Sequence, residues 1–356
     1  MTPLIKFFLI FSLGLGTTLT FISSHWLLAW FGLEINTLAI LPLMANNHPR
    51  ATEAATKYFL IQAASTAMLL FATTLNAWLQ EGWNIIQINN QTAAVLVVLA
   101  LALKLGLTPF HFWLPEVMQG LNLTTGLVLA TWQKLAPFAL LLQISYTRHP
   151  PLLTMLAVMS ALAAGWAGMN QTQLRKILAY SSTAHLGWMV IIIQYAPHLT
   201  MLTLGIYIFM TMTAFLTLKE TSSTKINILT LSWSKNPVMA TMMILILLSL
   251  AGLPPLTGFL PKWFILEELT KQEMATTATV IAMKSLLSLY FYMRLCYSST
   301  LTLFPSMTKL KLPWRRLSMK RTKMVLTAVT ALTLILLPIT PLISALAHSY
   351  SYILTP

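Results

Sequence analysis

Four ionisable residues lie deep inside strongly apolar stretches of the sequence: Glu34, Lys104, Lys134 and Lys284. At a helical rise of about 1.5 Å per residue, each lies near the middle of a hydrocarbon layer about 30 Å thick. An ionised side chain at that depth costs at least ~2.5 kcal/mol, so such residues usually mark a path for ions or protons inside a helical bundle. The chemistry that these residue types favour is reversible proton binding.

Lysine and glutamate can set each other's charge in such surroundings. Removal from water disfavours the ammonium form of a lysine, and a nearby carboxylate favours it again. Glu34 is the only acidic residue in the middle of a predicted span, which makes it the natural partner of one lysine, and the sequence leaves open which one. Extension of each lysine to a membrane interface is the alternative. It suits Arg294, near the end of its span, better than the central residues.

Two segments share the motif G-L-x-P-x4-L-P, one directly after Lys104 and one directly before Lys262. The segments, 103–116 and 249–262, are 146 residues apart. Each proline removes a backbone donor and interrupts a helix. Interrupted helices at matching positions are the best sequence indication of an ion site in a transporter. The motif therefore predicts an internal duplication with two broken helices that run in opposite directions.

His111 and His185 are the histidines inside predicted spans that could carry protons, because the ordinary histidine pKa is about 6.5. A single histidine in a helix can also be a hydrogen-bonded structural residue, and the sequence leaves both interpretations open. Cysteine occurs only at Cys296, whereas an iron–sulfur cluster needs several thiolates. We expect neither a cofactor nor a metal in this chain.

The elements that carry these residues are predicted to be transmembrane helices. Hydrophobic residues make up 57% of the chain and charged residues 8%, against roughly 25% charged residues in soluble domains. A span needs about 20 mostly apolar residues, and about eleven stretches meet that length. These stretches are 3–23, 25–44, 53–79, 92–119, 124–145, 151–170, 172–194, 198–219, 236–269, 274–300 and 324–346.

The predicted fold class is an all-α integral membrane protein built from two inverted repeats of five helices and a C-terminal helix. The first repeat would be 1–145, with its broken helix near 104–116. The second would be 146–300, with its broken helix near 250–263. Residues 301–356 would form a basic loop and the last transmembrane helix.

The distribution of charge supports the span count. If the N-terminus faces the basic side, nearly all basic loop residues fall on that side and only Arg148 and Lys271 on the other, as the positive-inside rule expects. The cluster at 309–323 is interpreted as a loop that faces lipid headgroups. These loops account for the net charge of +14, so we expect no nucleic-acid partner.

Four segments resemble the antiporter-like membrane-arm subunits of respiratory complex I, and the resemblance covers nearly the whole chain. The segments are T-P-F-H-F-W-L-P-E (108–116), L-A-G-L-P-P-L-T-G-F-L-P-K-W (250–263), H-W-L-L-A-W-F-G-L-E-I-N-T-L-A-I (25–40) and N-Q-T-Q-L-R-K-I-L-A-Y-S-S-T-A-H-L-G-W (170–188). The resemblance implies a proton-translocating, non-redox subunit of NADH:ubiquinone oxidoreductase. Proton movement would be coupled to quinone reduction in other subunits.

The resemblance also implies roles for individual residues. Glu34 and Lys104 would form the charge pair that biases proton binding in the first half-channel, and Lys134 would be the central lysine. Lys262 would be the lysine at the second broken helix. His185 would connect the two halves.

Further implications concern His111 and the surroundings of the chain. His111 would lie beside the first break. The partners would be other membrane-arm and accessory subunits of complex I and inner-membrane lipids. FMN, iron–sulfur clusters and ubiquinone would belong to partner subunits. The chain would be a multi-pass protein of the mitochondrial inner membrane, with its N-terminus and basic loops toward the matrix.

Two features depart from the family pattern. Related subunits have fourteen helices, and by this resemblance the chain would lack the first three, a shortening typical of the animal type that would make surrounding subunits more important. Lys284 matches no motif position, although its depth equals that of Lys134, so we expect it to face protein or a local polar pocket.

Two other functions are compatible with the same residues. A self-contained cation/proton antiporter would also have an inverted repeat and buried charges. However, an independent sodium carrier would be expected to have more intramembrane carboxylates than Glu34 alone. The other is a structural subunit that has lost pumping, against which the retained charged residues argue.

Overall fold

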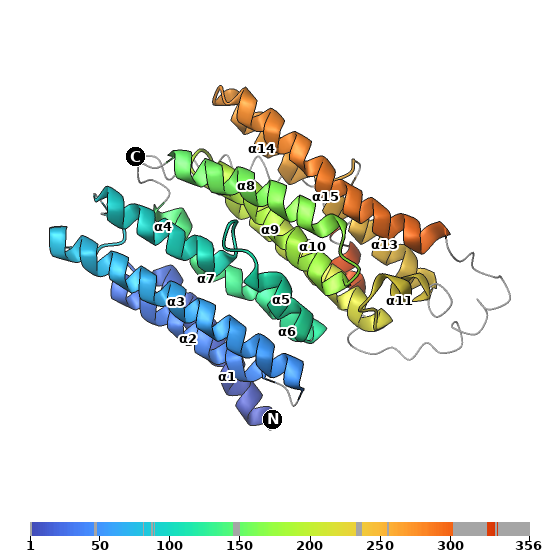
Figure 1. Cartoon of the computed structure of the whole chain (residues 1–356), viewed down its shortest axis with the longest axis horizontal. Coiled ribbons are helices and arrows are strands. Elements are labelled where there is room, and N and C mark those ends of the chain that lie inside the picture. Colours follow the sequence, from blue (N-terminus) through green and yellow to red (C-terminus); the bar gives the residue numbers. More distant parts are fainter. Residues whose placement is uncertain are drawn as a thin grey trace. The chain divides into compact units, whose positions relative to one another are not determined.

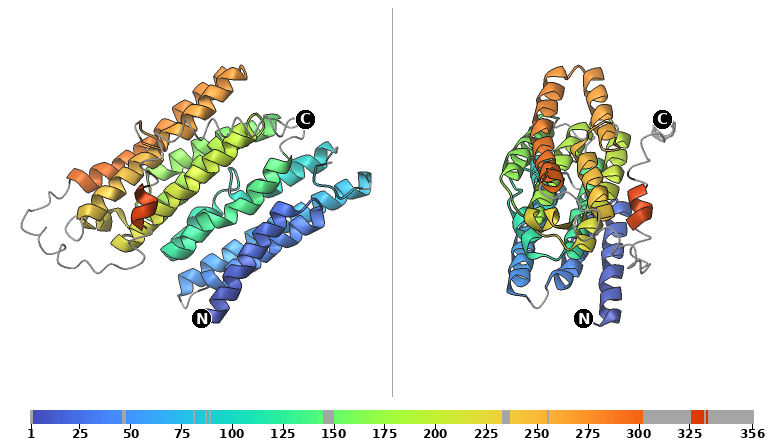
Figure 2. Two further views of the ribbon diagram at one scale, coloured as in Figure 1. Left: turned by 180° about the vertical axis from the view of Figure 1, so that it is seen from behind. Right: turned by 90° about the vertical axis from the view of Figure 1, so that its right-hand side faces the viewer.

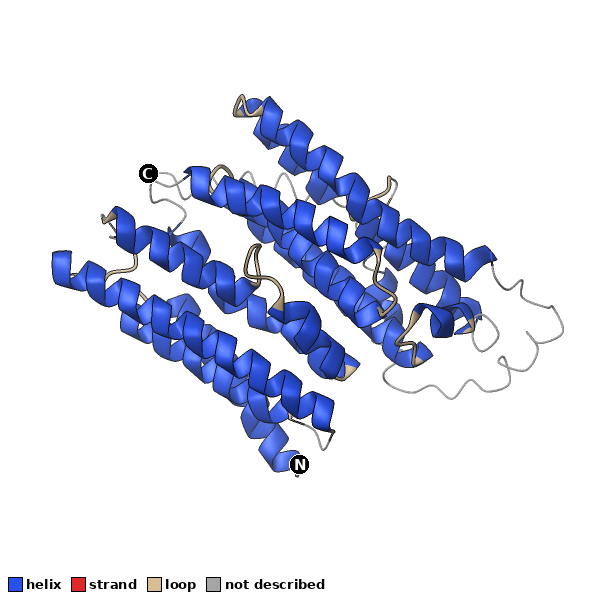
Figure 3. Ribbon diagram, viewed as in Figure 1, coloured by secondary structure: helices blue, strands red, loops and turns tan. Residues whose placement is uncertain are grey.

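The described part of the computed structural model consists of helices and the loops that join them, without strands (Figure 3). Isolated β-bridges join His25 to Asn84 and Gln173 to Lys225. The predicted basic cluster at 309–323 lies outside the described residues, as does most of the predicted span 324–346. The described residues are 2–45, 48–80, 82–86, 88, 90–144, 150–232, 237–254, 256–301, 326–331 and 333.

The chain divides into two compact units, Met1–Ser160 and Ala161–Pro356, which we call unit 1 and unit 2. In Figure 1 the chain runs from blue through green in unit 1 and from green to red in unit 2. In both views of Figure 2 the long helices within each unit run side by side. The division into inverted repeats at 1–145 and 146–300 stays a prediction.

In unit 1 the helices that carry Lys104 and Lys134 are neighbours. α3 packs against α2, α4 and α5, while α7 packs against α1, α2 and α4. The contact between α4 and α7 brings the two lysine-bearing helices together. The helices are α1 (Pro3–Ile22), α2 (Trp26–Met44), α3 (Pro49–Gln80), α4 (Gln91–Leu105), α5 (Trp113–Gly120), α6 (Leu123–Ala130) and α7 (Trp132–Ile144), with α8 (Pro150–Met169) crossing the unit boundary.

In unit 2 the helices that carry His185 and Lys262 are neighbours. α14 packs against α9, α10 and α15, and α13 packs against α10 and α15. The contact between α9 and α14 joins the helix of His185 to that of Lys262. The helices are α9 (Leu174–Ile192), α10 (Pro197–Thr221), α11 (Ile226–Thr230), α13 (Pro237–Ala251), α14 (Phe259–Lys271) and α15 (Ala275–Leu301).

Local sequence explains where several helices begin. The His25 ring accepts a hydrogen bond from the Leu27 N–H at the start of α2, and the Asn90 side chain accepts one from Thr92 at the start of α4. Such caps satisfy backbone donors that have no partner within the helix. Pro3 stands at the first position of α1, where its missing N–H costs nothing.

The first break ends α4 with a left-handed residue. Gly106 has a φ of +76°, which glycine adopts without the steric cost of a side chain. The Leu107 N–H donates to the Ala102 carbonyl at 2.9 Å and the Gly106 N–H donates to that of Leu103 at 3.3 Å. This is a Schellman closure, which satisfies carbonyls that the interrupted helix leaves unpaired.

The second break has the same backbone bonds 146 residues later. Gly252 has a φ of +78°, the Leu253 N–H donates to the Leu248 carbonyl at 3.4 Å, and the Gly252 N–H donates to that of Ser249 at 2.9 Å. The bond from Phe110 to Leu107 likewise recurs between Leu256 and Leu253. Both segments are therefore interrupted where the motif predicted a break.

Three predicted spans are divided by helix breaks, and two of these breaks lie where the motif predicted them. The predicted spans 92–119 and 236–269 each consist of two helices, α4 with α5 and α13 with α14. The predicted span 124–145 is also interrupted, at Thr131 between α6 and α7, which the sequence did not indicate. The count of eleven spans stays a prediction.

Six helical stretches of the described part are long and apolar enough to cross a membrane. Many of their large apolar side chains are exposed, such as Phe7 at 67% and Trp78 at 82%. An apolar exterior of this extent suits contact with lipid or with other apolar protein surfaces. The stretches are Pro3–Ile22, Trp26–Met44, Pro49–Leu79, Leu123–Ile144, Pro151–Met169 and Pro197–Thr221.

α1 and α2 approach each other through Gly16 and Gly32. A Cβ atom on either glycine would lie 2.8 Å from the carbonyl oxygen of the other. Small residues at such positions let helix backbones approach closely in membranes. The contact is formed by neighbouring segments of the chain and needs no other helix.

Candidate functional site

Lys104 lies in the last turn of α4, directly before the first break, and its side chain is buried. Only 5% of the residue is exposed. The Gln62 amide of α3 donates to the backbone carbonyl of Lys104 at 3.5 Å. α4 thus ends beside a buried amine. The backbone of that lysine is held by a neutral polar side chain of the neighbouring helix α3.

Lys134 lies in α7, three residues after the interruption at Thr131. It is as buried as Lys104, with 5% of the residue exposed. Both lysines line one cavity in unit 1. The structure therefore brings two of the predicted proton-binding residues to a common space.

The volume of this cavity open to the centre of a water molecule is about 20 Å³, more than the roughly 10–15 Å³ that one water requires. Besides the lysines, its polar lining comes from Asn36, Tyr58 and Gln133, among others. The Tyr58 hydroxyl donates to the Gln133 side-chain oxygen at 3.5 Å. A water in this space would have several polar partners.

Asn36 is the least satisfied polar residue of this cavity. The residue is 2% exposed, and both polar atoms of its side chain lack a hydrogen-bond partner among the described residues. Its backbone carbonyl accepts a bond from Gln133 at 3.4 Å. An unbonded buried amide is costly, so the side chain suits a site where it binds water or a transient partner.

Glu34 lies on α2 and is half-buried. Its Oε2 atom is buried without a hydrogen-bond partner in the described part of the chain. The carboxylate interacts electrostatically with Lys104 and with Tyr58, although the ion pairs within 4.0 Å among the described residues join other side chains. The pairing of Glu34 with Lys104 stays a prediction, because the two side chains interact electrostatically but form no ion pair within 4.0 Å in the described part of the chain.

His111 lies within the first break and is 4% exposed. Its ring packs against that of Phe112, with centroids 4.3 Å apart. It is not among the residues that line the cavity of Lys104 and Lys134. The structure therefore places His111 beside the break, as the sequence predicted, but apart from the lysine cavity.

Lys262 lies on α14, after the second break, and reaches back across it. Its Nζ donates to the carbonyl of Ala251, the last residue of α13, at 2.7 Å. The side chain passes over Gly252, where a Cβ would come within 2.7 Å of Nζ. Nζ also lies 5.9 Å from the centre of the Trp188 ring, within the range of a cation–π contact. An ammonium group at this helix end is electrostatically favourable because the free carbonyls carry partial negative charge.

His185 shares two cavities of unit 2 with Lys262. The volumes open to the centre of a water molecule are about 20 and 10 Å³. The His185 ring packs against that of Tyr207, with centroids 5.6 Å apart. The structure thus brings the predicted residues Lys262 and His185 together in one site of unit 2.

The two remaining basic residues of predicted spans are less deeply placed. Lys284 on α15 is half-buried and lines none of the three cavities described above. Arg294 is exposed and donates to the carbonyl of Met169, the last residue of α8. Its guanidinium thereby lies at a helix end, where a cation is favoured.

Sequence reasoning missed the neutral polar residues of both sites because it considered only ionisable groups. Asn36, Gln62 and Gln133 in unit 1 and Thr203 in unit 2 line the cavities. Their signal was available, since amides within apolar spans are rare and tend to face the bundle interior. In the described ranges, no three His, Cys, Asp or Glu side chains gather closely enough to hold a metal ion.

Comparisons with known proteins give a consistent result. Residues 23–288 match the family model described as NADH:quinone oxidoreductase/Mrp antiporter, and residues 289–344 match that of the NADH dehydrogenase subunit 2 C-terminus. The chain is 60% identical to NADH-ubiquinone oxidoreductase chain 2 of Salmo salar, covering 97% of this chain and 99% of that protein.

Solved structures show the same fold. A chain of respiratory complex I from Thermus thermophilus is similar with a TM-score of 0.84 and 27% identity, covering 95% of this chain and 79% of that one. A chain of an archaeal membrane-bound sulfane sulfur reductase is similar with a TM-score of 0.81 and 16% identity, covering 96% of this chain and 74% of that one. The latter likeness concerns the fold alone.

Proposed function

Because the chain belongs to the NADH:quinone oxidoreductase/Mrp antiporter family, in the branch of NADH dehydrogenase subunit 2, we propose that it translocates protons in the membrane arm of NADH:ubiquinone oxidoreductase. Its partners are the other subunits of that complex. The chain is a multi-pass protein of the mitochondrial inner membrane. In this proposal its basic loops face the matrix, and the redox cofactors belong to other subunits.

The observation that carries the proposal is the cavity of unit 1. Two buried lysines share a space that is large enough for a water molecule, and a carboxylate lies within electrostatic reach of one of them. Ionisable residues in such apolar surroundings are expensive and usually functional. A structural role would not require two amines beside one water-sized cavity.

Lys104 and Lys134 bind and release protons in turn, and water in their cavity carries the proton between them. A change in the distance between Glu34 and Lys104 alters how strongly that lysine holds its proton, because the carboxylate stabilises the ammonium form. Quinone reduction elsewhere in the complex drives this change. Glu34 is therefore the modulating residue, and the two lysines are the carriers.

Lys262 and His185 form the second site, where the proton passes through the two smaller cavities of unit 2. His111 lies beside the first break and is a candidate connection from the lysine cavity toward the membrane surface. The inverted-repeat arrangement is part of the same proposal. It is supported by backbone hydrogen bonds between equivalent residues at the two breaks, which are 146 residues apart.

The first experiment is extraction in mild detergent and native electrophoresis, followed by in-gel NADH oxidation and peptide identification. We expect the chain in a very large band with NADH-oxidising activity. Migration alone or as a small oligomer would contradict the proposal and favour a self-contained antiporter, for which ion-exchange assays in liposomes are the next step.

A further inference from the structure

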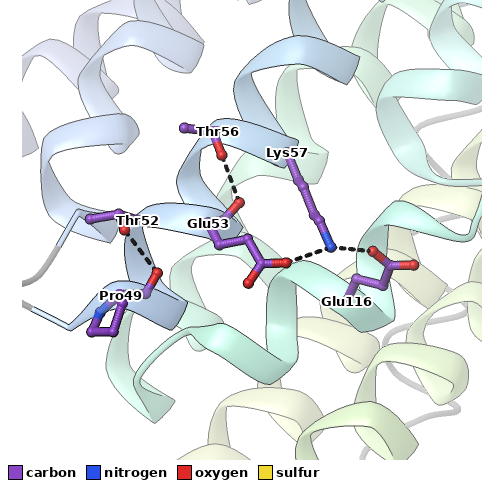
Figure 4. A network of polar contacts seen from close by, with 6 residues as sticks. All are labelled: Pro49, Thr52, Glu53, Thr56, Lys57 and Glu116. Atoms are coloured by element: carbon purple, nitrogen blue, oxygen red, sulfur yellow. Dashed lines mark hydrogen bonds and ion pairs between the residues drawn. The ribbon is translucent and has the colours of Figure 1, made fainter.

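Three charged residues from α3 and α5 form a cluster in unit 1 (Figure 4). Lys57 on α3 contacts Glu53, one turn earlier on the same helix, and Glu116 on α5, in each case with 2.9 Å between Nζ and a carboxylate oxygen. The side chains of Glu53, Lys57 and Glu116 are 62%, 43% and 54% exposed. We call these three residues the acidic cluster, since its carboxylates outnumber its ammonium group.

The acidic cluster is not explained by stability. Exposed ion pairs contribute roughly 0–1 kcal/mol each, and α3 and α5 already pack against each other. Acidic residues are scarce, because the 356-residue chain has only eight. Two of those eight nevertheless meet at one lysine from different helices.

The acidic cluster adjoins the lysine cavity on both of its helices. On α3, Tyr58 follows Lys57 directly, is 2% exposed and lines the cavity. On α5, Trp113 lies one turn before Glu116 and also lines it. The rings of Tyr58 and Trp113 pack with centroids 5.8 Å apart. The two helices that carry the acidic cluster thus also provide two aromatic residues of the cavity wall.

Tyr58 is able to conduct a proton into the cavity. Its hydroxyl donates to Gln133 on the cavity side at 3.5 Å, and a hydroxyl can donate one hydrogen while it accepts another. A proton that reaches the hydroxyl oxygen can thus be replaced by one that leaves toward the cavity.

We propose that the acidic cluster is where protons enter the lysine cavity from water, with the Tyr58 hydroxyl as the link. A carboxylate of Glu53 or Glu116 takes a proton from water and exchanges it past Lys57. The proton then passes Tyr58, directly or through water, to the amine of Lys104 or Lys134. No other bond forms or breaks, and the carboxylate is left ready for the next proton. This inference rests on the proposed proton-translocating function.

Unit 2 has no such cluster at the corresponding positions. The residues 146 positions after Lys57 and Glu116 are Thr203 and Lys262, and both line the buried cavity of His185. Where unit 1 has an exposed acid beside a lysine, unit 2 thus has a hydroxyl beside a lysine in the interior. The uptake role is therefore specific to unit 1.

The test uses the intact complex in liposomes, with Glu116→Gln as the variant and Glu267→Gln as the matched control. Glu267 forms an exposed i,i+4 pair with Lys271 at 2.8 Å and lines none of the three cavities. NADH-driven proton movement is measured in dilute and in concentrated small-molecule buffer. A mobile buffer can replace a lost proton acceptor at the surface but cannot repair a structural defect.

We expect Glu116→Gln to slow proton movement about tenfold in dilute buffer. This is less than the roughly 10²–10⁴-fold contribution typical of a positioned acid–base group, because Glu53 remains as a second carboxylate. Concentrated buffer should restore most of the loss, and Glu267→Gln should have no effect in either buffer. Equal rates for both variants, or a loss that buffer does not restore, would overturn the uptake role. Lys134→Met distinguishes failure of the uptake role from failure of the proposed function. Unchanged pumping in Lys134→Met would contradict the proposed proton translocation itself.

Discussion

The two helix breaks have the same backbone but different side chains around it. Both close with glycine at a φ near +77° and with equivalent hydrogen bonds. In unit 1 the lysine precedes the break and faces a cavity with a second lysine. In unit 2 the lysine follows the break and returns to the helix end before it. The breaks thus share one backbone arrangement, and the lysine lies before the break in unit 1 and after it in unit 2.

The largest expected effect tests whether unit 1 is the site with two carriers. Lys134→Met keeps the apolar stem and removes the amine. NADH-driven proton movement in liposomes should fall at least roughly 10²-fold, the lower end of a positioned acid–base contribution. Lys284→Met is the control, because Lys284 lines none of the three cavities. Equal pumping by both variants would remove the distinction between buried and half-buried lysines.

The next effect concerns the stability of the two helix breaks when a glycine gains a side chain. In Gly258→Ala the new methyl group would overlap the Ser249 carbonyl oxygen, and forced overpacking typically costs about 1–3 kcal/mol or more. Gly106→Ala at the first break should cost about 1–2 kcal/mol through its positive φ.

Thermal inactivation of the assembled complex measures both costs. Gly205→Ala is the control, because nothing lies within 4 Å of a Cβ atom at Gly205, and we expect it to be neutral or stabilising. A smaller loss for Gly258→Ala than for Gly106→Ala would show that the second break relaxes more readily than its packing indicates.

A smaller effect tests whether Asn36 binds a water molecule in the unit 1 cavity. Asn36→Leu removes an amide with no hydrogen-bond partner in the described residues. If that amide binds water, its loss should slow proton movement by about tenfold, the equivalent of one hydrogen bond of ~1.4 kcal/mol. Thr37→Val is the control in the same cavity, since its hydroxyl already donates to the Glu34 carbonyl at 2.8 Å. Unchanged pumping in Asn36→Leu would mean that Asn36 has no part in the path.

The smallest effect concerns a hydrogen bond between the second break and the C-terminal segment at Thr333. The buried Thr257 hydroxyl donates to the Thr333 carbonyl at 2.6 Å, whereas the equivalent residue of the first break is His111. Thr257→Val should cost about 1 kcal/mol, measured as a lower inactivation temperature of the complex. Thr279→Val, an exposed position with a hydroxyl bonded inside its own helix, should cost less. The reverse order would show that the C-terminal segment contributes nothing to this break.

The breaks and the charged residues could be predicted because their causes are local. Gly106 and Gly252 need a left-handed conformation, and the prolines beside them remove donors, so the motif alone marks an interrupted helix. The cost of a buried charge likewise singled out Lys104 and Lys134 without knowledge of their neighbours. The family resemblance then assigned roles that the residues alone left open.

The rest depends on which helices meet. Lys134 and Lys284 have the same depth in their spans, but Lys134 on α7 is only 5% exposed whereas Lys284 on α15 is half-buried. The interruption at Thr131 lies in a stretch that is apolar on both sides, so hydropathy does not reveal it. The electrostatic interaction of Glu34 with Lys104 depends on the packing of α2 and α4 against α3, which the sequence does not show.

The close contact of α1 and α2 has a consequence for biosynthesis. The Gly16–Gly32 contact is complete once residue 44 has been made, whereas Lys104 follows Glu34 by 70 residues. At roughly 5–20 residues per second, the carboxyl group spends about 4–14 s in a newly inserted helical hairpin before its lysine exists. An uncompensated charge is expensive in the bilayer. The Glu34 side chain is therefore expected to lie in the bilayer without its lysine partner until the later helices arrive.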